Sequence, residues 1–180
     1  MNIKGTIALA SLLSVAAFSA QAEIEKGQRY VGANANFLSY EEGSVMDASL
    51  LAVSGRFGAF VHENFSFEAR VGLGLIDGED NIYGTTVDIG LNHFFGIYAR
   101  AGLPLNEQLY PYALIGYTRG EVEASAYGFT VDEAASDSSL GFGVDFKFNE
   151  KMTLNAEFIN LLDKGGAEVS GFSLGIITPF

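Results

Sequence analysis

The sequence predicts an all-β chain whose strands close into an eight-stranded antiparallel transmembrane β-barrel. Three observations predict this fold class. Apolar residues recur at every second position in eight separate runs, the connections between the runs alternate between short and longer acidic segments, and the chain begins like a secretory signal peptide. Each run has roughly 10 to 15 residues, which is enough to cross a bilayer as a tilted strand.

The first 22 residues carry the features of a cleaved leader. Met1 to Lys4 is a short positive segment, residues 5–18 are apolar, and Ala20-Gln21-Ala22 matches the A-x-A pattern of a cleavage site. The apolar stretch is too short to cross a bilayer as a helix. We therefore expect Sec export to the bacterial outer membrane, cleavage of residues 1–22 after Ala22, and a single barrel domain over residues 23–180.

Composition excludes several kinds of partner and site. The net charge of −12 becomes −13 when Lys4 leaves with the leader, which argues against nucleic acid as a partner. The chain has no cysteine, so it can form no disulfide or thiolate site and cannot be anchored as a lipoprotein. No cofactor is expected.

Strand periodicity is clearest between Phe65 and Leu75, where Phe67, Ala69 and Val71 alternate with polar residues or glycine. A helix would scatter these apolar residues around its circumference. The eight runs that show period two cover about residues 31–37, 48–61, 65–75, 85–101, 109–123, 138–148, 152–162 and 169–180.

Two runs depart from a simple alternation of outward apolar and inward polar residues. In residues 85–101 the pattern directs Ile89 and Leu91 to lipid and Asp88 to the interior, with Phe94 and Tyr98 as large exceptions on the inward face. In residues 109–123 both assignments are open, because Tyr112, Leu114 and Val122 compete with Ala113, Ile115 and Tyr117. The positions of Arg119, Glu121 and Glu123 favour the first set as outward.

The connections differ in length between the two ends of the predicted barrel. Those near residues 62–64, 102–108 and 149–151 are mostly short, whereas those near 41–47, 76–84, 124–137 and 163–168 are mostly longer, acidic and rich in Gly and Ser. Short periplasmic turns and longer extracellular loops are typical of outer-membrane barrels. An even number of strands places both termini on the periplasmic side.

The end of the chain carries apolar residues in one phase. Phe172, Leu174 and Ile176 precede the terminal Phe180, while Thr178 stands where a larger apolar residue is more usual. This segment resembles the C-terminal signature strand of bacterial outer-membrane proteins. The resemblance implies that Phe172, Leu174, Ile176 and Phe180 form an assembly signal for the barrel-assembly machinery, with periplasmic chaperones as further partners during biogenesis.

The whole of residues 23–180 resembles the small outer-membrane β-barrel (porin-family) proteins, which include OmpA-like transmembrane domains and the OmpX and Ail group. The stretch from Gly102 to Tyr117 is also similar to such sequences. These patterns are architectural, so they imply the fold and the location, with outer-membrane lipid and lipopolysaccharide as surroundings.

Charged residues on the inward phase predict an ionic network inside the barrel. An eight-stranded barrel is filled by side chains, and isolated charges away from water are very costly, so these charges must pair. The predicted structural network comprises Arg56, Glu68, Arg70, Asp88, Arg100, Arg119, Asp145, Lys147 and Glu157. A gated polar pore is the alternative interpretation.

The acids of the longer connections are interpreted first as a solvated surface. They are Glu41, Glu42, Asp47, Asp77, Glu79, Asp80, Asp132, Glu133, Asp137 and Asp163. The segment Asp77-Gly78-Glu79-Asp80 lacks the D-x-D-x-D-G spacing of a calcium-binding loop. Weak binding of divalent cations beside lipopolysaccharide phosphates is the alternative, and acidic loops disfavour polyanion binding.

No catalytic constellation is evident. The only histidines are His62, in a predicted turn, and His93, in a predicted lipid-facing phase, and neither has a serine at a suggestive spacing. The sequence therefore predicts a non-enzymatic, non-conducting barrel with a structural or surface-interaction role. The alternative function is a small pore or transporter for ions or small hydrophobic molecules.

Overall fold

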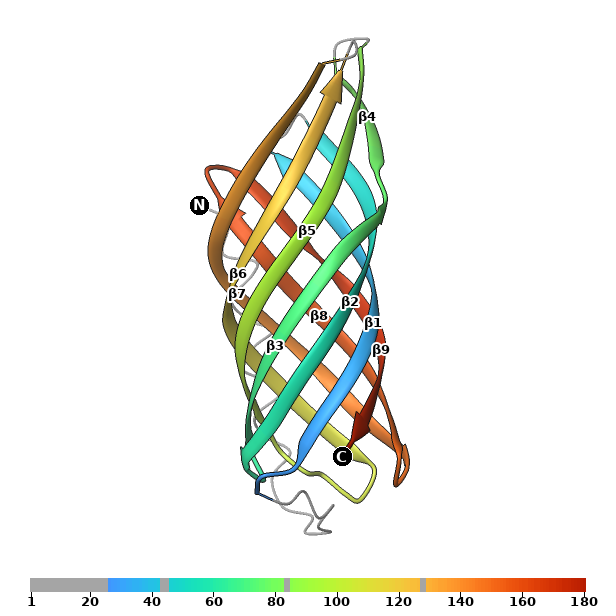
Figure 1. The fold of residues 1–180 in the computed structure, drawn as a ribbon, viewed down its shortest axis with the longest axis vertical. Helices are drawn as coiled ribbons and strands as arrows, with labels where there is room; N and C mark the ends of the chain where they lie inside the picture. Colours follow the sequence, from blue (N-terminus) through green and yellow to red (C-terminus); the bar gives the residue numbers. More distant parts are fainter. Residues whose placement is uncertain (1–25, 43–45, 83–84, 127–128) are drawn as a thin grey trace, which may run out of the picture.

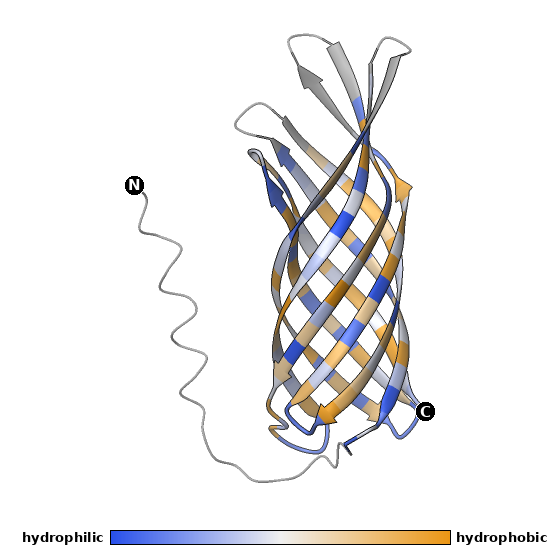
Figure 2. Cartoon of the chain, turned by 60° about the vertical axis from the view of Figure 1, so that its left-hand side comes forward, coloured by the Kyte–Doolittle hydropathy of each residue, from blue (hydrophilic) through white to orange (hydrophobic). Residues whose placement is uncertain are grey.

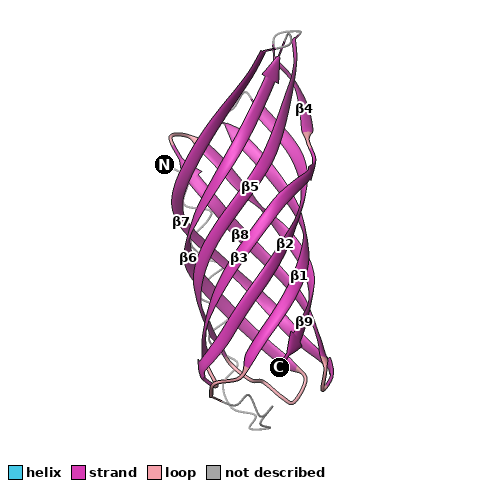
Figure 3. Cartoon of the chain, in the orientation of Figure 1, coloured by secondary structure: helices cyan, strands magenta, loops and turns pink. Residues whose placement is uncertain are grey.

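A computed structural model describes residues 26–42, 46–82, 85–126 and 129–180. In this part of the chain nine strands form one antiparallel sheet (Figure 1, Figure 3). They are β1 (Arg29–Glu42), β2 (Met46–His62), β3 (Phe65–Ile76), β4 (Gly78–Ile82), β5 (Thr85–Gly102), β6 (Leu109–Ala126), β7 (Phe129–Asn149), β8 (Met152–Lys164) and β9 (Ala167–Pro179). Within these ranges no helix is long and apolar enough to cross a membrane.

The sheet closes into a barrel with eight positions around its wall. The order is β3-β2-β1-β9-β8-β7-β6-β5-β4, and β3 also pairs with β5. Because β3 and the short β4 pair with successive parts of β5, they share one position in the wall. The predicted fold class is confirmed, and each of the eight predicted runs lies within one of these strands, apart from the terminal Phe180.

The start of β1 and the end of β9 lie side by side at the same rim of the barrel. The amide of Phe180 donates a hydrogen bond to the carbonyl of Arg29 over 2.9 Å, and β1 pairs with β9 from Tyr30 to Glu42. The short turns after β2, β5 and β7 lie at this end (Figure 1). This is the arrangement of a periplasmic rim.

At the opposite rim the strands extend further than the sequence predicts. Pairing between β6 and β7 continues to Ala126 and Phe129, so most of the predicted connection at 124–137 is hairpin. This hairpin, together with β4 and the start of β5, rises above the rest of the wall (Figure 1).

The outer surface is apolar through the middle of the barrel. Hydrophilic and hydrophobic residues alternate along the strands (Figure 2), and most of the large apolar side chains on the outward phase are more than a third exposed. Examples are Phe67 at 60 %, Ile97 at 57 % and Phe142 at 55 %. Such a belt is stable only against hydrocarbon, since water would meet a very large apolar patch.

The predicted outward face of β6 is wrong. Tyr112 and Leu114 are buried inside the barrel, whereas Ile115 and Tyr117 are 61 % and 53 % exposed. The polar residues of the same strand that suggested the reverse lie on the outward phase near its extracellular end, where Arg119 is exposed. Beyond the apolar belt, an outward-facing polar side chain meets water instead of hydrocarbon, so its exposure does not destabilise the barrel.

The predicted face of the first part of β5 is also wrong, because the strand contains a register shift between Leu91 and His93. Such a bulge inserts one extra residue and inverts the alternation beyond it. Ile89 and Leu91 are therefore buried, and Asp88 is exposed.

Candidate functional site

The periplasmic half of the lumen holds a cluster of buried charges contributed by five strands. Arg56 comes from β2, Glu68 and Arg70 from β3, Arg100 from β5, Asp145 from β7 and Glu157 from β8. All six lie on the inward phase of strands whose other face meets lipid, and each is 7 % exposed or less. Three arginines and three carboxylates give the cluster no formal net charge.

Arg70 joins the two glutamates of this cluster. Its Nε donates to Glu68, and its two terminal nitrogens donate to the carboxylate of Glu157, with 2.8 Å between NH2 and Oε2. Fork-shaped bonds of this kind between ionised groups are about twice as strong as neutral hydrogen bonds. Arg70 therefore fixes the relative positions of β3 and β8 across the lumen.

Arg100 joins Glu68 to Asp145. Its NH1 lies 3.2 Å from Glu68 Oε2, and its NH2 donates to Asp145 Oδ2. Arg56 is bound more loosely, because its terminal nitrogens lie 3.6 Å from Glu68 and 3.7 Å from Glu157. These nitrogens have no hydrogen-bond partner among the described residues, so Arg56 contributes charge balance rather than geometry.

Neutral side chains donate further hydrogen bonds to all three carboxylates. The Tyr30 hydroxyl donates to Glu68 over 2.9 Å, and the Tyr112 hydroxyl donates to Glu157 over 2.6 Å. The Asn155 amide donates to Asp145 over 2.6 Å. The Arg100 guanidinium also lies 3.7 Å from the centre of the Tyr112 ring, a distance suited to a cation–π contact.

The extracellular half of the lumen is filled by apolar side chains. They include Leu38, Leu50, Ala52, Leu91, Phe94, Ile159, Leu161, Leu162 and Val169, and all are 4 % exposed or less. Phe94 fits there because it faces Gly72, where a Cβ would overlap its ring. The ionic cluster is thus covered by an apolar layer on its extracellular side.

Three residues predicted for the ionic network lie elsewhere. Arg119 is exposed on the outer face of β6, and Asp88 is exposed on the outward phase of β5 beyond the bulge. Lys147 keeps the inward phase but is exposed at the periplasmic rim. The other six predicted residues are brought together in the cluster described above.

Sequence reasoning did not assign any tyrosine to the cluster. Tyr98 was correctly predicted on the inward face of its run, and in the structure the Arg70 guanidinium lies 4.7 Å from the centre of its ring. The ring of Tyr98 lies against Gly96 and Gly116, where a Cβ would collide with it. Tyr112 was missed because both faces of its strand carry apolar residues.

The two histidines lie apart from each other and from the buried cluster. His62 and His93 are both exposed, His62 at the periplasmic rim and His93 on the outer face. In the part of the chain that the structure describes, no group of three His, Cys, Asp or Glu residues is arranged to hold a metal ion. The side chains of Glu42, Asp47, Glu79, Asp80 and Asp132 lie outside that description.

A closed antiparallel barrel with an apolar outer belt, an interior filled by side chains around a buried ionic cluster, and both ends at one rim defines an integral outer-membrane β-barrel protein. Residues 7–177 match the model of the outer membrane protein beta-barrel domain, and the chain belongs to this family of the bacterial outer membrane. No curated protein matches the sequence.

Several solved structures share this fold at low sequence identity. The attachment invasion locus protein Ail of Yersinia pestis is 12% identical, with a TM-score of 0.65 over 87% of this chain and 100% of Ail. Neisserial surface protein A is 12% identical, with a TM-score of 0.66 over 91% and 100% of the two chains. The N-terminal barrel of Pseudomonas aeruginosa OprF is 16% identical, with a TM-score of 0.52 over 86% and 100%. Ail has also been solved with the heparin analogue sucrose octasulfate.

Proposed function

We propose that this chain is a non-conducting, non-enzymatic barrel that stabilises the outer membrane and presents an acidic surface to the outside. The observation that carries the proposal is the burial of the lumen. Arg100 is 1 % exposed and Leu91 is 3 % exposed, although a water-filled channel would leave both accessible. A narrow barrel filled by side chains suits a structural or surface role better than transport.

The exposed acids near the extracellular rim support a surface role. Glu41, Asp77, Asp88, Glu133 and Asp163 are all exposed there. Like charges at this density disfavour a polyanionic partner and favour cations or cationic surfaces. The divalent cations bound to the surrounding lipopolysaccharide are cationic partners of this kind.

Conductance tests the closed lumen directly. The purified, refolded barrel in a planar lipid bilayer is expected to give no reproducible open state, because both the ionic cluster and the apolar layer block water. A channel-forming porin in the same bilayer serves as the positive control. A reproducible open state of substantial conductance would overturn this proposal and favour the pore alternative.

We also propose that the chain is exported with cleavage after Ala22 and assembled through its terminal strand. Support comes from the outer face of β9, where Phe172, Leu174, Ile176 and the terminal Phe180 are 50–67 % exposed, and from the pairing of β9 with β1 that closes the barrel. An assembly factor could therefore contact these residues before closure.

Expression of the Phe180→Ala variant tests this route of assembly. We expect a several-fold lower yield of heat-modifiable barrel in the outer-membrane fraction, while the intact mass of the wild-type protein corresponds to a chain beginning at Glu23. Leu103→Ala, an exposed apolar substitution at the same rim, is the matched control. Equal yields from Phe180→Ala and wild type would contradict the signal, and another starting residue would contradict the cleavage site.

A further inference from the structure

One strand pairing of the described barrel joins strands from the two ends of the chain, namely that of β1 with β9, which runs from Tyr30 to Glu42 on β1. The other neighbours in the wall follow one another along the chain, apart from β3 and β5, which are separated by the short β4. Hairpin pairings need only local contacts, whereas β1 meets β9 only when the whole sheet curls. This pairing, here called the seam, therefore closes the barrel.

The lumenal face of the seam is uncharged through most of its length. The inward positions of the two strands hold Tyr30, Gly32, Asn34, Asn36, Leu38, Val169, Gly171, Ser173, Gly175 and Ile177. Two hydrogen bonds of 3.2 Å cross the seam, because the Asn34 amide donates to Ser173 on β9 and to Asn155 on β8. Both join neutral groups, so these positions of β1 and β9 bring no ion pair to closure.

Glu157 on β8 binds cations that lie across the seam, on β2 and β3. Arg70 binds both of its carboxylate oxygens, with 2.8 Å between NH2 and Oε2, and NH2 of Arg56 lies 3.7 Å from Oε2. In an open sheet β5, β6 and β7 separate β8 from β3, so these two strands are four spacings of about 4.8 Å, or roughly 19 Å, apart. Arg56, on β2, is one spacing further away. Both ion pairs of Glu157 therefore require the curled, closed sheet.

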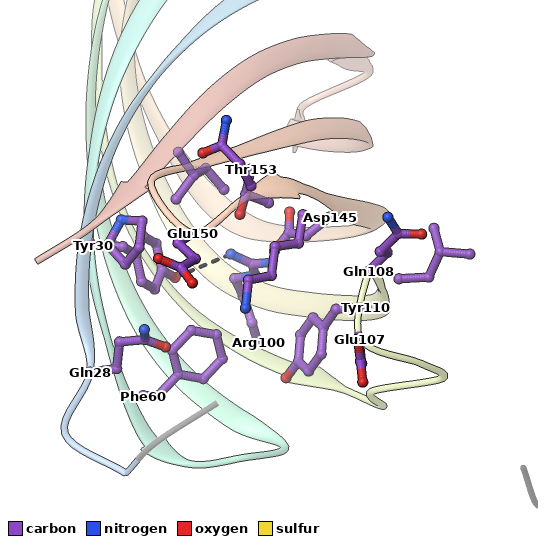
Figure 4. Close-up of a pocket in the computed structure, with 15 residues that line it drawn as sticks. Gln28, Tyr30, Phe60, Arg100, Glu107, Gln108, Tyr110, Asp145, Glu150 and Thr153 are labelled. Carbon is purple, nitrogen blue, oxygen red and sulfur yellow. Dashed lines mark hydrogen bonds and ion pairs between the residues drawn. The ribbon is translucent and has the colours of Figure 1, made fainter. Parts of the chain in front are cut away.

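The other two carboxylates of the cluster have cations on their own side of the seam. Glu68 binds Arg70 on its own strand and Arg100 on the neighbouring β5. Asp145 on β7 binds Arg100 with one strand between them. Figure 4 shows Arg100 and Asp145 where they line a pocket at the periplasmic mouth, with NH1 of Arg100 donating to the Tyr30 hydroxyl over 3.1 Å. These ion pairs can form in a sheet that has not yet closed.

An open sheet thus leaves Glu157 without a cation. The Tyr112 hydroxyl on β6 can still donate to it, because only β7 lies between these strands. A carboxylate that is away from water and lacks a cation is very costly. We propose that Glu157 is a latch for barrel closure: its carboxylate binds Arg70 and Arg56 as β1 meets β9, and reopening the seam requires both ion pairs to break. The latch acts in assembly and does not depend on the proposed surface role.

Engineered cysteine pairs test the latch, because the chain has no cysteine of its own. Ala35 and Leu174 are directly opposite across the seam, and Val53 and Leu73 are directly opposite in the β2–β3 hairpin. Each pair is replaced by cysteines in turn, and disulfide formation is timed while the purified barrel refolds from urea into lipid vesicles under an oxidant. Glu157→Gln is expected to slow the seam disulfide several-fold and to leave the hairpin disulfide unchanged, because it removes the charge that the two arginines bind at closure.

Asp145→Asn is the matched control, because it also removes a buried carboxylate, but one whose partner Arg100 lies on the same side of the seam. This variant is expected to leave the ratio of the seam rate to the hairpin rate unchanged. Glu157→Asp, which keeps the charge on a shorter side chain, is expected to slow the seam disulfide to a smaller degree and replaces the glutamine variant if that one does not fold. Unchanged seam closure in a folded Glu157 variant, equal slowing of both disulfides, or the same selective slowing in Asp145→Asn would each overturn the proposal.

Discussion

The Arg70→Ala variant is expected to unfold with a free energy about 3–5 kcal/mol lower than that of the wild-type barrel. Arg70 is buried, and its guanidinium binds both Glu68 and Glu157. Removing it leaves two buried carboxylates whose charge is balanced only by the longer ion pairs to Arg56 and Arg100, beside the hydrogen bonds from Tyr30 and Tyr112. Urea unfolding in lipid vesicles, followed by the heat-modifiable shift in gel migration, measures the loss.

Arg119→Ala is the matched control for this experiment, because Arg119 is exposed on the outer face of β6. Substitutions of exposed residues usually change stability by no more than about 0.5 kcal/mol. Similar losses for the two alanine variants would contradict the assignment of Arg70 to the buried cluster and of Arg119 to the outside.

A double variant separates lost pairing from lost packing. Glu157→Gln alone removes the charge that Arg70 compensates, and the pair Arg70→Ala with Glu157→Gln removes charge from both sides. The two substitutions are expected to be non-additive, with the double variant less destabilised than the sum of the single ones, because residues in one ionic network couple. Additive losses would mean that Arg70 acts through packing alone.

Much of this arrangement follows from the sequence because lipid imposes a strict rule on the outer face. In the run from Phe65 to Leu75 every outward position is apolar, so Glu68 and Arg70 can only point inward. The same rule places Asp145 and Glu157 correctly. Because buried charges need partners, the presence of four inward-facing charges on three strands predicts that these side chains contact one another inside the barrel.

The face of a strand cannot be assigned from this rule where the alternation is interrupted or where the lumen is itself apolar. The bulge in β5 is not visible in the pattern, since Ile89, Leu91, Phe95 and Ile97 keep the same odd spacing on both sides of it. The lumen beyond the bulge is apolar, so the inward positions there carry the same residue types as the lipid face. Periodicity locates a strand in such a segment, but only the register of its neighbours identifies the face.

In strand β6 the face predicted from the sequence was wrong, and a substitution on its outward face is expected to have the second large effect on stability. Ile115→Arg is expected to lower the free energy of unfolding by about 2–4 kcal/mol, the usual loss when a charge faces the hydrocarbon core of a barrel. Ile115 is 61 % exposed between Ala99 and Leu140, two residues that are themselves part of the outer belt. Urea unfolding in vesicles of defined lipid measures the change.

Alanine substitutions of two neighbouring residues complete the test of the face assignment. Leu114→Ala leaves a hole in the packed lumen and is expected to lower stability by about 2–5 kcal/mol. Ile115→Ala is expected to lose much less, because fluid acyl chains refill the space beside it. The face first expected from Arg119, Glu121 and Glu123 requires the reverse order, so the ranking of these adjacent variants decides which side of β6 meets lipid.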